Sequence, residues 1–184
     1  MKQNFKKDKL NLLLKYPQNL FHSQDLALLW DIKNRNTLYT TVKRYIKKGV
    51  LVRIQKGFYS KIPLEQLNPL KLGLGFLHSF AYLSTESIIS QSGIISQSIP
   101  YTTFVSNQSK RFKIKDNLYL SRQMKDEFLF NKTGIVEKDG VKQAITERAV
   151  ADLIYYSPNY HFDAPSLIDW RKVKDIQKLI GFKS

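Results

Sequence analysis

Residues 37–62, TLYTTVKRYIKKGVLVRIQKGFYSKI, decide how we interpret this chain. Over about Thr37–Lys48 the apolar residues recur at the spacing of a helix with roughly 100° per residue, and Gly49 ends the pattern. These apolar residues are Leu38, Val42, Tyr45 and Ile46. We therefore expect a helix that buries this side and turns threonine and basic side chains outward.

Two short β-rich runs follow this helix. They cover Val50–Ile54 and Phe58–Ile62, and the polar tip Gln55–Gly57 between them contains a glycine, which is typical of a β-hairpin. The helix and the hairpin therefore form a continuous unit in which the hairpin carries basic residues at and near its tip.

Upstream, the sequence predicts two shorter helices. An apolar cluster at Leu10–Leu14 ends at Pro17, and Ser23 is a candidate N-cap for a second helix with its own apolar face. Residues Asp31–Asn36 are polar and form the turn before the helix at Thr37. Three helices followed by a basic hairpin predict a winged helix-turn-helix, which places its third helix in the major groove of DNA and its wing on the backbone.

The candidate DNA contacts lie at the start of the third helix, on its outer side and on the wing. They are Arg35, Asn36, Thr37, Thr40, Lys43, Arg44, Lys47, Arg53, Gln55 and Lys56. Residues near the start of the helix would meet base edges, and the later cations would lie near phosphates. A solvated basic surface helix is the alternative for the helix taken alone.

The basic residues are concentrated in the first third of the chain. The 184 residues contain 30 lysines and arginines against 15 acidic residues, and residues 1–63 hold 14 of the basic residues but only three of the acidic ones. A local positive field of this kind attracts a polyanion, either nucleic acid or an acidic membrane surface. With the predicted fold, we expect double-stranded DNA as the partner.

Composition also bears on the cellular setting. The chain has no cysteine, which excludes disulfides and thiolate metal sites and favours the cytoplasm. The charged stretch Met1–Lys9 lacks the apolar core of a signal peptide. The best apolar stretch, Leu70–Leu83, is interrupted by polar residues and glycines and is too short to cross a bilayer. We expect a soluble cytoplasmic protein without membrane contact.

The remainder of the chain predicts an α+β domain with a small, mostly antiparallel sheet, so that the domains are residues 1–63 and 64–184. Pro63–Pro69 is the expected connector, with one helical turn. The expected strands are Tyr101–Ser106, Arg111–Lys115, Leu118–Ser121, Glu127–Phe130, Gly134–Glu137 and Val141–Ile145, with Lys138–Gly140 as a hairpin turn. The expected helices run from Ser84 or Thr85 to Gly93, from Thr146 to Pro158, and from about Pro165, with Asp163 as cap, to Ile180.

Nothing in the sequence indicates catalysis. The three histidines lie far apart without ligand spacing, and neither a phosphate-binding glycine loop nor a nucleophile elbow is present. The acidic pair Asp126 and Glu127 is expected at a strand edge in a solvated role. We predict a protein that is not an enzyme and uses no metal or cofactor; a nuclease or nucleotidyltransferase ranks behind the binding functions.

One polar segment in the second domain carries a separate hypothesis. Asn107–Arg111 joins two expected strands and brings the basic pair Lys110 and Arg111 into a nearly neutral domain. This pair is a candidate second contact with nucleic acid or with a protein partner. An ordinary exposed loop is the alternative.

Three segments of the chain resemble the AbiEi family of antitoxins and related transcriptional regulators, from type IV toxin-antitoxin systems of abortive infection. They are Leu51–Tyr59, Tyr82–Ile95 and Thr146–Tyr156, in the family's order. The resemblance implies a winged-helix domain that represses the protein's own operon, and a C-terminal domain that counteracts a nucleotidyltransferase-like toxin. The leading expectation is a sequence-specific autorepressor and antitoxin. The alternative is an interaction module whose basic face docks an acidic protein such as a toxin.

Overall fold

The computed structural model describes residues 8–182, and the chain divides into two compact units, Met1–Asn68 and Pro69–Ser184. The boundary predicted from the sequence lies between residues 63 and 64, at the beginning of the connector rather than at its end. Most of the stretch Met1–Lys9, on which the expected absence of an export signal rests, lies outside the described residues.

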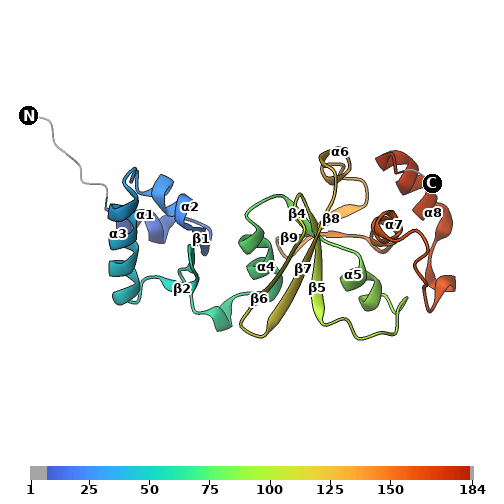
Figure 1. The fold of residues 1–184 in the computed structure, drawn as a ribbon, viewed down its shortest axis with the longest axis horizontal. Coiled ribbons are helices and arrows are strands. Elements are labelled where there is room, and N and C mark those ends of the chain that lie inside the picture. Colours follow the sequence, from blue (N-terminus) through green and yellow to red (C-terminus); the bar gives the residue numbers. More distant parts are fainter. Residues whose placement is uncertain (1–7, 183–184) are drawn as a thin grey trace, which may run out of the picture. The chain divides into compact units, whose positions relative to one another are not determined.

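The N-terminal unit combines three helices with a small sheet (Figure 1). In chain order its elements are α1 (Lys9–Lys15), β1 (Leu20–His22), α2 (Ser23–Leu29), α3 (Arg35–Lys47), β2 (Val52–Gln55), β3 (Phe58–Ser60) and the 3-10 turn η1 (Leu64–Gln66). The sheet has the order β1-β3-β2, and both pairings are antiparallel. The three helices and the hairpin occur where the sequence predicted them, whereas β1 was not expected.

Side-chain caps set the helix starts in this unit. Asn34 Oδ1 accepts a hydrogen bond from Thr37 N (3.0 Å), so α3 begins at Arg35, two residues before the predicted start. The expected N-cap of α2 at Ser23 is wrong by one residue, because His22 occupies the N-cap position and its backbone N–H donates to Asp25 Oδ2 (2.7 Å). The three predicted helices are present, and α2 and α3 begin one and two residues before their predicted starts.

One apolar core holds the N-terminal unit together. All three helices and the sheet contribute to it: its buried members are Leu13, Phe21, Leu26, Trp30, Ile32, Leu38, Val42, Tyr45, Leu51 and Tyr59. Trp30 stacks on Tyr45 with ring centroids 5.2 Å apart, which ties α3 to the end of α2. The packing fixes which side of α3 faces inward and hence which side meets the solvent.

The C-terminal unit is built on a mixed six-stranded sheet with the order β6-β7-β5-β4-β9-β8. The strands are β4 (Ala81–Leu83), β5 (Tyr101–Ser106), β6 (Lys110–Ile114), β7 (Asn117–Gln123), β8 (Ile135–Lys138) and β9 (Val141–Ala144). Three neighbouring pairs are antiparallel, and the pairs β4–β9 and β5–β7 are parallel. The predicted α+β class with a mostly antiparallel sheet is confirmed.

Helices cover both faces of this sheet (Figure 1). They are α4 (Pro69–Leu77), α5 (Glu86–Gln91), α6 (Asp126–Leu129), α7 (Thr146–Tyr156) and α8 (Trp170–Ile180), with the 3-10 turn η2 (Pro165–Leu167) before α8. Helix α4 lies on one face, α5 and α7 lie on the other, and α8 packs on α7. A Cβ on Gly73 would come within 2.6 Å of the Tyr119 ring, so α4 approaches its face through a glycine.

Several expectations for this unit are wrong. Glu127–Phe130 is not a strand, because Asp126–Leu129 forms the short helix α6, and α4 and β4 were not predicted. The last helix begins at Trp170, where Asp169 Oδ1 accepts from Lys172 N (3.0 Å), while Asp163 Oδ2 accepts from Ser96 N (2.6 Å). The stretch from Pro165 is a separate 3-10 turn.

Candidate nucleic-acid interface

Helix α3 divides sharply into a buried and an exposed side. Its buried residues are Leu38, Thr41, Val42 and Tyr45. All seven candidate contacts on this helix are exposed: Arg35, Asn36, Thr37, Thr40, Lys43, Arg44 and Lys47. The periodicity of the sequence therefore placed the outer face of α3 correctly.

Four of these residues form a stripe along the middle of the exposed face. Asn36, Thr40, Lys43 and Lys47 follow one another at spacings of four, three and four residues, which places them one above the other on a helix. Within residues 8–182, their side chains make no hydrogen bond or ion pair. None of the residues that the structure describes occupies their polar groups, so these groups can meet a ligand.

The other candidates on α3 are engaged within the helix. Arg35 Nε donates to the Tyr39 hydroxyl (3.0 Å), and its guanidinium lies 5.4 Å from the centre of that ring. Thr37 Oγ1 donates to Asn34 Oδ1 (3.3 Å), so this hydroxyl supports the N-cap. The Arg44 guanidinium lies 5.7 Å from the Tyr45 ring centre. Arg35 and Thr37 would have to release these partners to contact a base.

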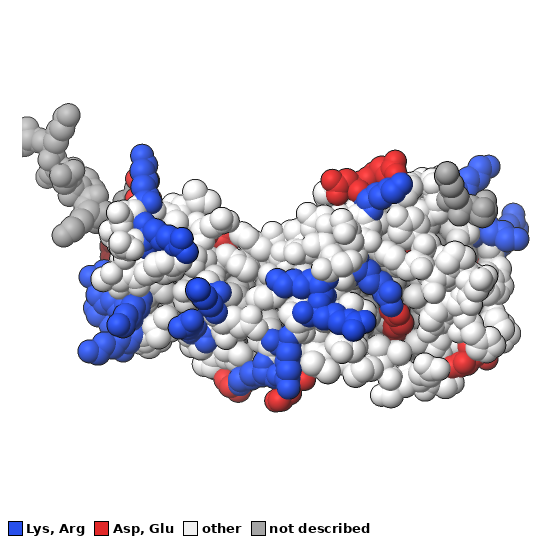
Figure 2. All heavy atoms as spheres, viewed as in Figure 1, with Lys and Arg blue, Asp and Glu red and all other residues white. Residues whose placement is uncertain are grey.

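Basic residues dominate the stretch of sequence that forms α3 and the hairpin. The sequence from Ile32 to Leu64 contains nine lysines and arginines and no aspartate or glutamate. On the face drawn in Figure 2, basic side chains gather over the region of the N-terminal unit where Figure 1 places α3. The surface around α3 therefore has a positive potential.

The hairpin presents its two cations to the solvent. Arg53 on β2 and Lys56 at the tip are exposed, whereas Gln55 is half-buried. Gly57 adopts a positive φ of 81°, and its carbonyl oxygen accepts from Ser23 N (2.9 Å). The tip is thus fixed against the start of α2, and Arg53 and Lys56 project from a short, anchored hairpin.

The basic pair of the second unit does not lie in a loop. Lys110 and Arg111 are the first residues of β6, which forms an edge of the six-stranded sheet. The Lys110 ammonium lies 4.4 Å from the Phe76 ring centre, and the Arg111 guanidinium lies 5.9 Å from that of Tyr101. Both side chains are exposed. The strand thus begins at Lys110, one residue before the predicted start at Arg111, and both residues of the pair lie on a regular strand.

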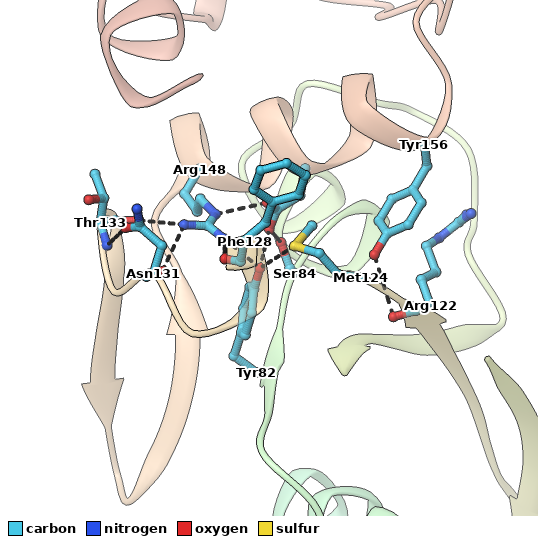
Figure 3. Close-up of polar contacts among 10 residues, drawn as sticks. Tyr82, Ser84, Arg122, Met124, Phe128, Asn131, Thr133, Arg148 and Tyr156 are labelled. Atoms are coloured by element: carbon cyan, nitrogen blue, oxygen red, sulfur yellow. Dashed lines mark hydrogen bonds and ion pairs between the residues drawn. The ribbon is translucent and has the colours of Figure 1, made fainter. Parts of the chain in front are cut away.

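A different cationic site lies buried inside the C-terminal unit (Figure 3). Arg148 on α7 is fully buried, and its Nε pairs with Asp152 Oδ1 one turn later (2.8 Å). Its Nη1 donates to the carbonyl oxygens of Asn131 (3.1 Å) and Thr133 (2.9 Å), and its Nη2 donates to the Tyr82 hydroxyl (2.8 Å). The guanidinium is thus satisfied on all sides by the protein.

Asp152 completes this network, which we call the Arg148 network: Tyr82, Ser84, Arg148 and Asp152. Its Oδ2 accepts from the hydroxyls of Ser84 (2.8 Å) and Tyr82 (3.0 Å). Burial raises the pKa of the Asp152 carboxyl, and the Arg148 guanidinium acts in the opposite direction. Burial also raises the pKa of Tyr82, so that this hydroxyl stays protonated and donates. The network joins α7 to β4 and to the segment before β8.

Sequence reasoning missed this network, although one signal was present. Arg148 and Asp152 stand four residues apart within the apolar helix pattern from Thr146, a spacing that places opposite charges together. The sequence also predicted that Ser84 or Thr85 caps the following helix. Neither does: the Ser84 hydroxyl binds Asp152, and Thr85, at the N-cap position, makes no side-chain cap hydrogen bond.

The described residues offer little for other site classes. Between residues 8 and 182, no group of three histidine or acidic side chains is arranged to hold a metal ion. Asp126 and Glu127 lie in the first turn of α6, not at a strand edge. Glu127 Oε1 forms an ion pair with Lys125 Nζ (3.8 Å). In the same range, no helix combines the length and apolar character needed to cross a bilayer.

Comparison with known proteins gives a likeness of fold. No protein-family model matches the sequence, and no curated protein matches it. Among solved structures, the crystal structure of the RV2827C protein from Mycobacterium tuberculosis is similar, with a TM-score of 0.52 and 12% sequence identity. The alignment covers 92% of this chain and 69% of that one. At this identity the likeness concerns the fold alone.

Proposed function

We propose that the N-terminal unit is a winged helix-turn-helix and that the protein is a cytoplasmic, non-enzymatic repressor that binds double-stranded DNA sequence-specifically. The observation that carries this proposal is the exposed face of α3. Its polar and basic side chains have no protein partners among the described residues along the central stripe, while the opposite side of the helix is fixed in the core.

The stripe matches the chemistry of a major groove. Asn36 and Thr40 lie toward the start of α3, where an asparagine can pair bidentately with adenine and a threonine can contact a thymine methyl group. Lys43 and Lys47 follow on the same line, with Arg44 beside them, and suit phosphate oxygens. Arg53 and Lys56 on the hairpin would hold the adjacent backbone. Asn36 and Thr40 would thus recognise the base sequence, and the cations would position the protein on the DNA backbone.

The resemblance to AbiEi antitoxins supports autorepression and an antitoxin role for the C-terminal unit. Two of the segments that carry the resemblance, Tyr82–Ile95 and Thr146–Tyr156, meet in the Arg148 network. We propose a nucleotidyltransferase-like toxin, opposed directly or indirectly, as the second partner. Co-expression with a neighbouring gene of that class tests this role: growth is restored if the proposal holds and stays arrested if it fails.

Sequence preference tests the DNA-binding proposal. We expect the full chain to retain a duplex from its own promoter and to release an unrelated duplex of equal length at physiological salt. Asn36→Ala should remove roughly 1–3 kcal/mol of discrimination at a single base position while leaving affinity for unrelated DNA unchanged. Equal binding of both duplexes by the wild-type protein would contradict sequence-specific recognition.

The same basic face would suit an acidic protein surface. Capture of a neighbouring gene product, combined with no affinity for any duplex at physiological salt, would support that interaction module instead. A result of this kind would replace the repressor proposal.

A further inference from the structure

A shallow basic groove lies at one end of the β6–β7 hairpin in the C-terminal unit. Its volume is about 480 Å³. The polar residues that line it come from the start of β6, the end of β7 and the end of α7: Ser109, Lys110, Arg111, Ser121, Arg122, Gln123 and Tyr156. No aspartate or glutamate is among its lining residues. We call it the β6–β7 groove.

Contacts within the protein restrain the cations at the groove. Arg122 is 29% exposed, its guanidinium lies 5.6 Å from the Tyr156 ring centre, and it forms an ion pair with Glu86, which is not a lining residue. Lys110 and Arg111 lean on aromatic rings, as described above. Ser109 Oγ accepts from Gln123 N (3.3 Å), which joins the two rims. Cations restrained in this way lose little conformational freedom when they bind an anion.

The chemistry of the groove fits phosphate groups. The Arg111 and Arg122 guanidinium groups line the groove together with the hydroxyl and amide side chains of Ser109 and Gln123, whereas the Lys110 ammonium lies at the rim, against Phe76 of α4 on the other face of the sheet. Guanidinium groups bind phosphate oxygens bidentately. Basic side chains also lie over the middle of the C-terminal unit on the face drawn in Figure 2. Lys113, exposed on the same edge strand, extends the basic surface beyond the groove.

We propose that the β6–β7 groove is a second DNA contact, which binds the sugar-phosphate backbone of double-stranded DNA. This inference rests on the proposed function and adds a sequence-independent contact on the other unit. Because the two units share one chain, the second contact forms at a high effective concentration and strengthens binding without reading bases.

Removal of the two rim cations tests the groove. We expect the full-length Lys110→Ala plus Arg111→Ala variant to bind the promoter duplex about 10- to 60-fold more weakly at 0.1 M salt, and the log-log salt slope to fall by about 2. Preference for promoter over unrelated duplex should remain. The matched control is Lys174→Ala plus Lys178→Ala, which removes two exposed cations from α8 and should change little.

A second variant changes the groove in the opposite direction. Glu86→Gln keeps the size of the side chain but removes the negative charge that faces Arg122, so DNA affinity should rise several-fold at low salt. Glu147→Gln is its control, because Glu147 forms an ion pair with Lys172 (3.1 Å) away from the groove lining. The control should shift affinity far less.

The outcomes separate this inference from the function on which it rests. Wild-type affinity and slope in the Lys110/Arg111 variant, with promoter binding intact, would overturn the groove alone. Absence of duplex binding by the wild-type protein would overturn the proposed function. A single-stranded oligonucleotide that binds more tightly than the duplex and is lost in the Lys110/Arg111 variant would also overturn the duplex assignment.

Discussion

The exposed face of α3 and the Arg148 network both contain basic side chains, yet they differ in what satisfies the charge. Arg148 donates to a carboxylate, a hydroxyl and backbone carbonyl oxygens and is fully buried. Lys43 and Lys47 on α3 are exposed, and their side chains have no protein partner among residues 8–182. The Arg148 network therefore stabilises the folded C-terminal unit, whereas Lys43 and Lys47 can still bind a ligand.

The difference teaches that charge alone does not locate a binding surface. A buried cation loses its hydration and must be paired within the protein, so its removal or the removal of its partner acts on stability. An exposed cation keeps its hydration, and its removal acts on ligands. Substitutions at the two sites should therefore have separate effects, and each prediction below tests that separation.

The largest effect is expected at Asp152. Asp152→Ala leaves the buried Arg148 guanidinium without its counter-charge, which should lower the free energy of unfolding by roughly 3–5 kcal/mol. Urea denaturation measures this change. Asp175→Ala, an exposed position on α8, is the control and should change stability by only a few tenths of a kcal/mol. A loss of stability for Asp152→Ala no larger than that for Asp175→Ala would contradict the structural role of the Arg148 network.

A smaller effect is expected at Ser84. Its hydroxyl is fully buried and donates to Asp152 Oδ2 (2.8 Å), so Ser84→Ala takes one donor from a buried carboxylate. We expect a loss of about 1–3 kcal/mol in the free energy of unfolding. Ser98→Ala, at an exposed position, provides the reference in the same denaturation experiment. Equal stability of the two variants would mean that this hydrogen bond contributes nothing.

The two asparagines at the start of α3 offer a matched pair. Asn34 caps the helix, so Asn34→Ala should cost about 1 kcal/mol of stability. Asn36 is exposed without a partner among the described residues, so Asn36→Ala should leave the unfolding curve nearly unchanged while altering base preference. The account fails here if the costs in stability are reversed.

The smallest effect on stability is expected for the exposed cations. Lys43→Ala plus Arg44→Ala removes no buried contact, so the free energy of unfolding should change by less than about 0.5 kcal/mol. The midpoint of urea denaturation measures this. A loss comparable to that of Asp152→Ala would mean that these side chains serve the fold and not a ligand.

Local signals explain how much of the N-terminal unit was predictable. The apolar spacing of α3, the proline after α1 and the glycine in the hairpin each act within a few residues. Strand β1 was not predicted, because three residues are too few to show an alternating pattern and its partner β3 lies far along the chain. The engagement of Thr37 by Asn34 depends on where α3 begins, which the sequence placed two residues too late.

The C-terminal unit was harder to predict because its decisive contacts are distant in sequence. Tyr82 and Ser84 meet Arg148 and Asp152 across 66 and 68 residues. Helix α4 contains Gly73, which the contact with the sheet requires but which disfavours a helix in a sequence pattern. The four-residue helix α6 is too short for either period to be recognised, and it was taken for a strand.

The measurement that tests the central claim most directly is the salt dependence of DNA affinity. Wild-type protein and Lys43→Ala plus Arg44→Ala are titrated against the promoter duplex at several salt concentrations, with Lys174→Ala plus Lys178→Ala as the charge-matched control. We predict weaker binding and a log-log slope reduced by about 2 for the α3 variant only. Equal affinities and slopes for all three proteins would contradict the assignment of α3 as the DNA-binding helix.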